Sequence, residues 1–246
     1  MITHTKVIIL RMVDYQDSSY ILTVLSEEHG KIALIAKGAK RPKNKLSGIL
    51  QTGSILDVVY YYKNTRSVQT LTEASIEYSA DVFRKHFDRA AVLYAVLELL
   101  GQLVHDNEVN TPIFAFANNF IQWLGEADDA KPQIFPYAQI RLAEISGIGL
   151  VDSRDTEEQR AYLNIESGSI SARSEGEASY KLTENQTLFV TLALHYRSSS
   201  IFNVDLENAE LKQLVQHLDL YFKYHIEGYR ERKSDSIFEQ MLQVHP

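Results

Sequence analysis

The stretches TKVIILRMV (residues 5–13), SYILTVL (19–25) and KIALIA (31–36) are rich in β-branched residues and end at polar or turn-forming residues. This pattern is typical of β-strands. Glu27-Glu28-His29-Gly30 separates the second stretch from the third, and a glycine readily takes the positive φ of a tight turn. We therefore expect these two strands to form a hairpin.

Two more strands complete the N-terminal part. ILDVVYYYK at residues 55–63 predicts a fourth strand, Asn64-Thr65-Arg66 a turn, and residues 67–74 a fifth strand. Between the third and fourth strands, residues 38–53 form a polar, basic connection. Five short strands in about 80 residues are typical of a small barrel, and the OB-type barrel is the common five-stranded form. An SH3-like barrel fits the pattern almost as well.

From Asp81 onward the pattern changes to a helical one. Expected helices begin at Asp88, at Thr111 (as N-cap before Pro112) and at Ile134, while a capping box at Thr183 precedes another over residues 188–196. Asp205 is a candidate cap for a long helix to His225, a short helix is expected over residues 233–242, and residues 162–172 predict a β-hairpin. The fold class is thus α+β, with a five-stranded OB-type barrel at 1–80 and a mainly helical domain with a small hairpin at 81–246.

Composition excludes several classes of protein. The chain has 246 residues and no cysteine, so it has no disulfide, thiolate zinc finger, iron–sulfur cluster or cysteine nucleophile. The apolar run at residues 7–10 is too short for a secretory signal, and the run at 90–104 contains Glu98 and is shorter than the ~20 residues of a membrane span. We expect a soluble cytoplasmic protein without a membrane partner.

Charge is distributed unevenly along the chain. Residues 1–80 hold ten Lys/Arg and seven Asp/Glu, whereas the remainder holds fifteen and twenty-five, within a net charge of −7. No acid occurs between His29 and Leu56. Such a local positive surface is what phosphate neutralisation requires. The predicted DNA contacts are Lys37, Lys40, Arg41, Lys43 and Lys45, followed by Lys31, Arg11, Lys63 and Arg66.

Tyr60, Tyr61 and Tyr62 lie on the fourth predicted strand. Alternation places Tyr60 and Tyr62 on one face and Tyr61 on the other. Aromatic side chains beside Lys63 and Arg66 could stack on bases. At least one of the two faces must belong to the core, so a packing role is the alternative for each tyrosine.

Motifs of known catalytic or metal sites are absent. The sequence contains no GxxxxGK[ST], HExxH or GxSxG. We therefore predict no catalytic residues, no metal site and no cofactor. In the helical part, cations beside apolar helices are candidates for binding an acidic partner peptide, namely Arg84, Lys85, Arg89 and Arg141.

The N-terminal sequence resembles the RecO family of bacterial DNA-repair proteins. The resemblance rests on the order and spacing of short motifs: Ile9-Leu10-Arg11, Asp14-Tyr15, Asp17-Ser18-Ser19, Ile21-Leu22-Thr23, Glu28-His29-Gly30-Lys31, Ala36-Lys37-Gly38-Ala39-Lys40, Ser47, Leu50-Gln51, Leu71-Thr72-Glu73-Ala74 and Leu97-Glu98-Leu99-Leu100. It covers about the first 100 residues well. Near the C-terminus, His225, Gly228 and Lys233-Ser234 resemble the family's ending.

This resemblance implies a recombination mediator. Family members bind single- and double-stranded DNA, anneal complementary strands and, with a RecR-type partner, help load a RecA-type recombinase onto DNA coated by single-stranded-DNA-binding protein. Some members carry a four-cysteine zinc site in the helical part. Where the first cysteine pair would fall, this chain has Val151, Asp152 and Ser153. The resemblance therefore implies DNA binding at the bacterial nucleoid but no zinc.

Three functions are compatible with the sequence. The first is a DNA-binding mediator that neutralises two strands at once and has no reaction chemistry of its own. The second is a protein-interaction adaptor, in which the barrel holds a protein partner and the basic connection is incidental. The third is a hydrolase with an unrecognised site.

Overall fold

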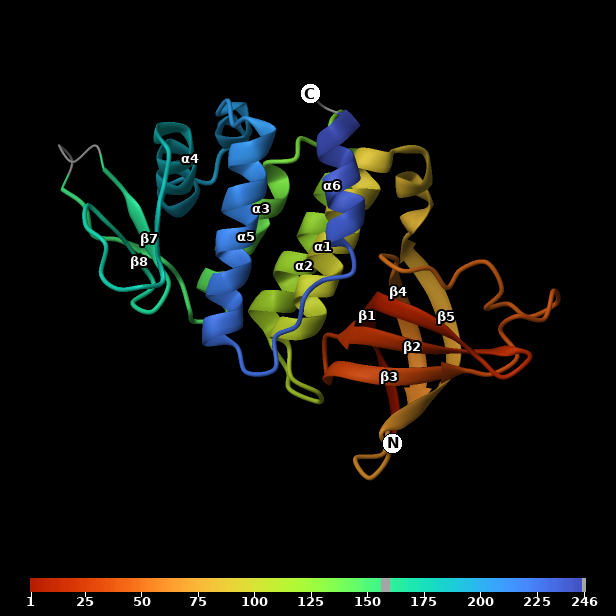
Figure 1. Cartoon of the computed structure of the whole chain (residues 1–246). Helices are drawn as coiled ribbons and strands as arrows, with labels where there is room; N and C mark the ends of the chain where they lie inside the picture. Colours follow the sequence, from red (N-terminus) through yellow and green to blue (C-terminus); the bar gives the residue numbers. More distant parts are fainter. Residues whose placement is uncertain (156–159, 245–246) are drawn as a thin grey trace. The chain divides into compact units, whose positions relative to one another are not determined.

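The computed structural model describes residues 1–155 and 160–244. The chain folds into two compact units, Met1–Asp128 and Asp129–Pro246. Within the described residues, the first unit consists of a β-barrel followed by a 3₁₀ turn and two helices, and the second of four helices, a 3₁₀ turn and a small sheet (Figure 1).

The barrel is built from five strands and closes in the order β1-β2-β3-β5-β4. Its strands are β1 (Ile2–Tyr15), β2 (Ser19–Ser26), β3 (Gly30–Ala36), β4 (Ile55–Tyr61) and β5 (Val68–Tyr78). Every neighbouring pair is antiparallel except β3 and β5, which pair in parallel through residues 33–35 and 68–70. The OB-type barrel is thereby confirmed over the SH3-like alternative. Gly30 adopts φ +64°, as expected for the β2–β3 turn.

Side-chain alternation along the strands fills the barrel. Val7 and Ile9 of β1 face inward with Leu22 and Val24 of β2, and Leu34 of β3 completes this layer. A bulge in β1 between Ile9 and Arg11 shifts the pairing with β2 by one residue. The bulge turns Met12 toward the core and leaves Arg11 exposed on the outer face.

The two helices of the first unit follow a short 3₁₀ turn. The elements are η1 (Ala80–Lys85), α1 (Phe87–Leu103) and α2 (Thr111–Glu126). Helix α1 is apolar on nearly every side and is buried, as its sequence predicts. The expected cap at Thr111 is wrong by one residue. Asn110 is the N-cap because its Oδ1 accepts from the backbone N–H of Ile113 at 3.0 Å, and Thr111 is already helical.

The second unit contains more strands than the sequence predicts. Its elements are α3 (Ile134–Ile145), β6 (Val151–Asp152), β7 (Tyr162–Asn164), β8 (Ser169–Ser171), β9 (Ser179–Lys181), α4 (Glu184–His195), η2 (Ser199–Asn203), α5 (Asn208–His225) and α6 (Asp235–Val244). The predicted hairpin is β7–β8, and β6 and β9 extend it into a sheet of order β6-β8-β7-β9. Strands β6 and β9 escape prediction because they are too short to show alternation and lie outside the stretch that predicts the hairpin.

Helix boundaries in this unit follow local capping. The capping box of Thr183 and Gln186 is confirmed at the start of α4. Asp205, in contrast, does not cap α5. Glu207 holds that position, and its backbone N–H donates to the Glu210 carboxylate at 3.1 Å. Asp205 instead lies in the extended segment that follows η2.

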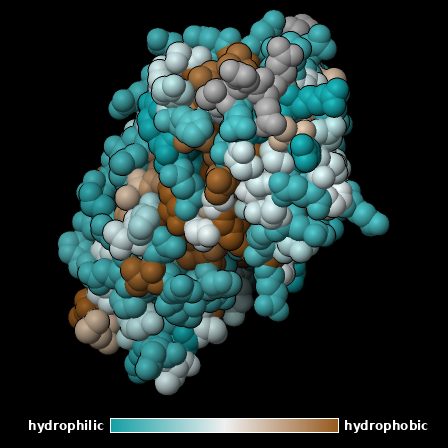
Figure 2. All heavy atoms as spheres, turned by 90° about the vertical axis from the view of Figure 1, so that its left-hand side faces the viewer, coloured by the Kyte–Doolittle hydropathy of each residue, from teal (hydrophilic) through white to brown (hydrophobic). Residues whose placement is uncertain are grey.

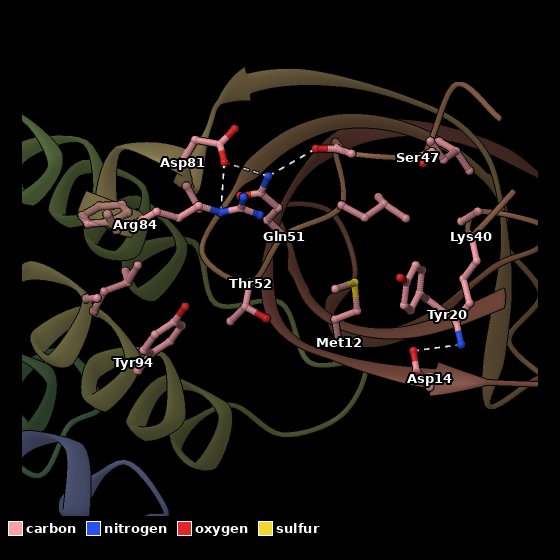
Figure 3. Close-up of a pocket in the computed structure, with 18 of the residues that line it drawn as sticks. Met12, Asp14, Tyr20, Lys40, Ser47, Gln51, Thr52, Asp81, Arg84 and Tyr94 are labelled. Atoms are coloured by element: carbon pink, nitrogen blue, oxygen red, sulfur yellow. Dashed lines mark hydrogen bonds and ion pairs between the residues drawn. The ribbon is translucent and has the colours of Figure 1, made fainter. Parts of the chain in front are cut away.

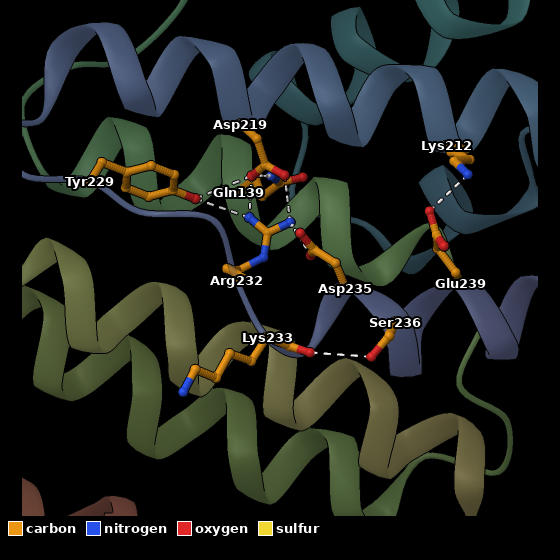
Figure 4. A network of polar contacts seen from close by, with 9 residues as sticks. All are labelled: Gln139, Lys212, Asp219, Tyr229, Arg232, Lys233, Asp235, Ser236 and Glu239. Carbon is orange, nitrogen blue, oxygen red and sulfur yellow. Dashed lines mark hydrogen bonds and ion pairs between the residues drawn. The ribbon is translucent and has the colours of Figure 1, made fainter.

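Arg232 anchors the C-terminal segment of the second unit (Figure 4). Its guanidinium is buried, pairs with Asp219 of α5, donates to Asp235 at 2.7 Å and lies 4.7 Å from the ring centroid of Phe135. Burial opposes its charge, but the hydrogen bond and charge of Asp219 outweigh burial and raise the pKa of Arg232. Removing one member of such a buried pair typically destabilises a protein by about 3–5 kcal/mol.

Candidate nucleic-acid interface

The connection between β3 and β4 is held on the barrel by buried apolar side chains. Ala39, Leu46 and Leu50 belong to the barrel core, with at most 8% of each exposed. Asn44 fixes the bend between them, since its side chain donates to the carbonyl of Gly38 at 3.0 Å and accepts from the backbone N–H of Leu46 at 2.8 Å. Core packing therefore dictates which side chains of this connection point to solvent.

Residues 37–45, here named the basic loop, project cations from this anchored connection. Lys37, Arg41, Lys43 and Lys45 are exposed, and within the described part of the chain none of them forms an ion pair. Lys40 differs from these four. Its Nζ lies 2.9 Å from Oδ1 of Asp14 and 5.2 Å from the ring centroid of Tyr20. The basic loop is thus a fixed positive surface with four free cations and one paired cation.

The other predicted DNA contacts lie elsewhere on the barrel. Strand β5 starts opposite Ala33 and runs parallel to β3, so the β4–β5 turn lies toward the start of β3. The basic loop follows the opposite end of β3 (Figure 1). Exposed Lys63 and Arg66 in that turn are therefore separated from the basic loop. Gln69 holds the turn by accepting from the backbone N–H of Lys63 at 2.9 Å and donating to the Arg66 carbonyl at 2.8 Å.

Lys31 has contacts that the sequence does not reveal. Its Nζ donates to the carbonyl of Gly101 in α1 at 2.8 Å and lies 3.3 Å from Oδ1 of Asp106. Arg11 is exposed on the outer face of β1, opposite Thr23 of β2. Of these two cations, Arg11 is the one whose position leaves it open to a nucleic acid.

The three consecutive tyrosines have separate roles. Tyr60 is fully buried, and its hydroxyl lies 2.7 Å from Nδ1 of His29. Burial raises the pKa of Tyr60 to about 12. Tyr62 stacks on the His29 ring with centroids 3.8 Å apart, and Tyr61 is 48% exposed. Base stacking by Tyr60 is therefore excluded, and its packing role is the correct interpretation.

Cations predicted to bind a partner peptide also differ in availability. Arg84 and Lys85 are exposed and line a groove together with Lys40. Arg89 is buried and donates to the carbonyl of Gly125, in the last turn of α2, at 3.0 Å and to that of Asp128, just beyond the helix, at 3.1 Å. Arg141 is half-buried beside Glu144. Its pKa is lowered mainly by burial and, to a smaller extent, by the positive charge of Arg197. Arg84 and Lys85 are the members of this group most open to a ligand.

In the second unit, the position of the first expected cysteine pair holds an ion pair. Arg154 donates to the Asp152 carboxylate through Nε at 2.9 Å and Nη2 at 2.7 Å, and also to Thr191 at 2.6 Å. Burial would raise the pKa of Asp152, but the hydrogen bonds from Arg154 hold it below its ordinary value. No group of three or more metal-ligating side chains occurs among the described residues.

Family comparisons cover nearly the whole chain. Residues 1–80 match the family model described as recombination protein O N terminal, and residues 84–235 match the one described as recombination protein O C terminal. The boundary between the two family models falls near residue 80, whereas the boundary between the two compact units falls at residue 128. None of the described helices is long and apolar enough to cross a membrane.

Curated relatives bear the name DNA repair protein RecO. The protein of Chlorobium limicola is 32% identical over 155 residues, which is 63% of this chain and 59% of the relative. The corresponding match to Pelodictyon phaeoclathratiforme spans 56% of that relative. The protein of Chlorobium phaeobacteroides is 26% identical over 98% of this chain and 99% of its own length. None of these names states a catalytic activity. From the two family models and these relatives we conclude that the chain belongs to the RecO family of DNA repair proteins.

Proposed function

We propose that this protein binds single- and double-stranded DNA through the basic loop, anneals complementary strands, and helps to load a recombinase onto DNA coated by single-stranded-DNA-binding protein. The observation that carries the proposal is the anchored loop with its free cations. An anchored loop that contains no acidic residue can neutralise phosphates without first having to become ordered. Neutralising the phosphates of two complementary strands side by side reduces their mutual repulsion and lets them anneal.

Family membership supports the wider part of this proposal. The relatives are named as DNA repair proteins, which is consistent with a mediator without catalytic residues acting at the bacterial nucleoid. Its proposed partners are DNA, single-stranded-DNA-binding protein, a RecR-type protein and, indirectly, a RecA-type recombinase. The tail of single-stranded-DNA-binding protein is the acidic peptide that cations of the helical part would hold.

The basic loop is tested by the salt dependence of DNA binding. Replacing Arg41, Lys43 and Lys45 by Ala removes three exposed cations and keeps the buried anchors. The plot of log K against log salt for single-stranded DNA should flatten by roughly 2, since each lost phosphate contact changes the slope by about 0.7. Binding should weaken alike for all sequences, because phosphate contacts carry no base information.

A charge-matched variant is the control. Arg173, Lys181 and Lys223 are exposed cations of the second unit, and replacing all three by Ala changes the net charge equally. This control should keep the parent slope in fluorescence anisotropy titrations. Equal slopes in the parent and the loop variant would show that DNA, if bound, lies elsewhere.

A protein-interaction adaptor is the second candidate, and one observation favours it. Figure 2 shows hydrophobic residues gathered along the middle of one face among mostly hydrophilic ones. In the second unit, Val151, Leu188 and Tyr196 are each at least half exposed. An exposed apolar patch such as the one in Figure 2 is typical of protein–protein contacts. A parent protein that binds no DNA at low salt would favour the adaptor.

A further inference from the structure

The first unit contains a groove of about 1090 Å³ beside the basic loop. One wall comes from the barrel, with Met12, Tyr20 and Lys40, and the other from η1 and α1. Three cations line it, Lys40, Arg84 and Lys85, together with two acids. Sites that hold drug-sized molecules occupy roughly 300–1,000 Å³, so this groove is at the upper end of that range.

Each acid of the groove is paired with one of its cations. Asp14 holds Lys40 at 2.9 Å, and Asp81 holds Nε of Arg84 at 3.1 Å. Figure 3 shows the two pairs on opposite sides of the groove. Both carboxylates are more than half exposed. The Arg84–Asp81 pair is exposed, whereas the Lys40 side chain is only 24% exposed. Because both carboxylates face solvent, an incoming phosphate can reach each cation and replace the carboxylate.

The α1 wall presents aromatic side chains to the same groove. Phe87 is 47% exposed and Tyr94 is 40% exposed, and Ala90 lies between them on the same helical face. Half-exposed aromatic rings beside cations form the combination that binds unstacked bases. A duplex keeps its bases stacked and would leave these rings unused.

We propose that this groove binds a segment of single-stranded DNA. The phosphates of the strand displace Asp14 from Lys40 and Asp81 from Arg84. The bases stack on Phe87 and Tyr94. The inference rests on the proposed DNA-binding function and assigns the path of one strand beside the basic loop. In the free protein, Asp14 and Asp81 occupy the positions of the phosphates. Their negative charges lower the affinity of the groove for DNA and oppose the binding of anions that bind more weakly than DNA.

Removing the two carboxylates tests the proposal. Asp14→Asn and Asp81→Asn should each raise the affinity for an oligo-dT strand roughly fivefold at about 50 mM salt and steepen the salt slope by about 0.7. Asp17→Asn is the matched control. Asp17 is an exposed acid of the adjacent β1–β2 turn that lies outside the groove lining, so its affinity gain should stay below about twofold.

Stacking is tested separately from charge. Tyr94→Ala should weaken oligo-dT binding about tenfold, whereas Tyr94→Phe should bind as the parent does. Tyr224→Ala removes an exposed tyrosine from α5 of the second unit and should have no effect. Because Tyr94 is partly exposed, these variants should retain the parent melting temperature.

The outcomes distinguish a failure of the proposed DNA-binding function from a failure of the groove assignment alone. A parent protein that binds no DNA overturns the proposed function and this inference together. A parent that binds DNA, with Asp14→Asn and Asp81→Asn indistinguishable from Asp17→Asn, overturns this inference alone. Variants that change binding of an acidic, aromatic-ended peptide but not of oligo-dT would make the groove a peptide site, and the inference would again be wrong.

Discussion

His217 is a buried histidine whose pKa is shifted by burial alone among the described residues. It lies on α5, is 7% exposed and stacks on Tyr180 with ring centroids 4.1 Å apart. Its Nδ1 has no hydrogen-bond partner among the described residues. Burial lowers the pKa of His217 from its ordinary value of 6.5. The native protein therefore holds this ring neutral at a pH where the unfolded chain would protonate it.

This shift makes stability depend on pH. Below about pH 6.5 the unfolded chain binds a proton that the native chain does not, so the free energy of unfolding falls as the pH decreases toward the lower native pKa. His217→Phe keeps a ring against Tyr180 but cannot titrate. Urea unfolding at pH 5, 6 and 7 should show a smaller loss of stability on acidification in the variant. Parallel curves for the two proteins would contradict the assignment.

At single residues, the sequence predicts positions better than it predicts contacts. Alternation correctly separates Tyr61 from Tyr60 and Tyr62, but nothing in the sequence states which face belongs to the core. The cation run from Lys37 to Lys45 indicates an exposed basic surface. The contact of Lys31 with Gly101 is unpredictable, because 70 residues of chain separate the partners. Contacts between distant residues depend on the fold and leave no local pattern.

Polar side chains contribute to the stability of the sheet β6-β8-β7-β9. Asp152 and Arg154 are both nearly buried and make a two-point contact. Asn164, 2% exposed, donates to Ser171 at 2.9 Å and accepts from the backbone N–H of Glu175 at 3.1 Å. These bonds act together with the buried side chains of Leu163 and Ile170 to order the short strands.

Zinc removal should therefore leave the fold intact. A chelator should not change the melting temperature of the protein, and elemental analysis should find no stoichiometric zinc. Arg154→Met should instead lower the free energy of unfolding by about 3 kcal/mol, because Asp152 would be left as an unpaired buried charge. Arg173→Met, at an exposed position of the same sheet region, is the control. A chelator-dependent melting temperature would refute the prediction.

Among whole elements, long ones leave a clearer pattern in the sequence than short ones. The five barrel strands and the helices α1 to α5 are long enough for their residue pattern to indicate them, α1 through a continuous apolar run. Strands β6 and β9 do not, and they form only because the β7–β8 hairpin offers them open edges. The helix starts at Asn110 and Glu207 differ from the predicted ones by one or two residues, because several neighbouring polar residues can serve as caps.

At the scale of the whole first unit, the barrel is covered on the outside as well as filled on the inside. Ile8 of β1 lies opposite Leu25 of β2 and Ile55 of β4. These three side chains are at most 1% exposed although they alternate with the inward-facing ones. Helix α1 packs against β1, and a Cβ on Gly53 would lie 2.8 Å from Leu93. The barrel and α1 therefore share apolar surface.

A fragment of residues 1–128 should consequently unfold cooperatively, whereas a fragment of residues 1–80 should not. The shorter fragment exposes Ile8, Leu25 and Ile55, and burial of each such side chain contributes about 2 kcal/mol. Thermal unfolding followed by circular dichroism compares the two fragments. A sharp transition in the 1–80 fragment, equal to that of 1–128, would show that the barrel is a domain by itself and support the boundary at residue 80.

The parallel pairing of β3 with β5 has a consequence for engineering. Since these strands bond directly to each other, the ring of hydrogen bonds does not pass through residues 37–54, so residues added at an exposed position of that connection leave the ring intact. Doubling a flexible loop typically costs only about 0.6 kcal/mol. Gly48 is exposed, and a Cβ added there would meet nothing within 4 Å. A reporter peptide inserted at Gly48 would thus be carried by the barrel without opening it, close to the surface where DNA is proposed to bind.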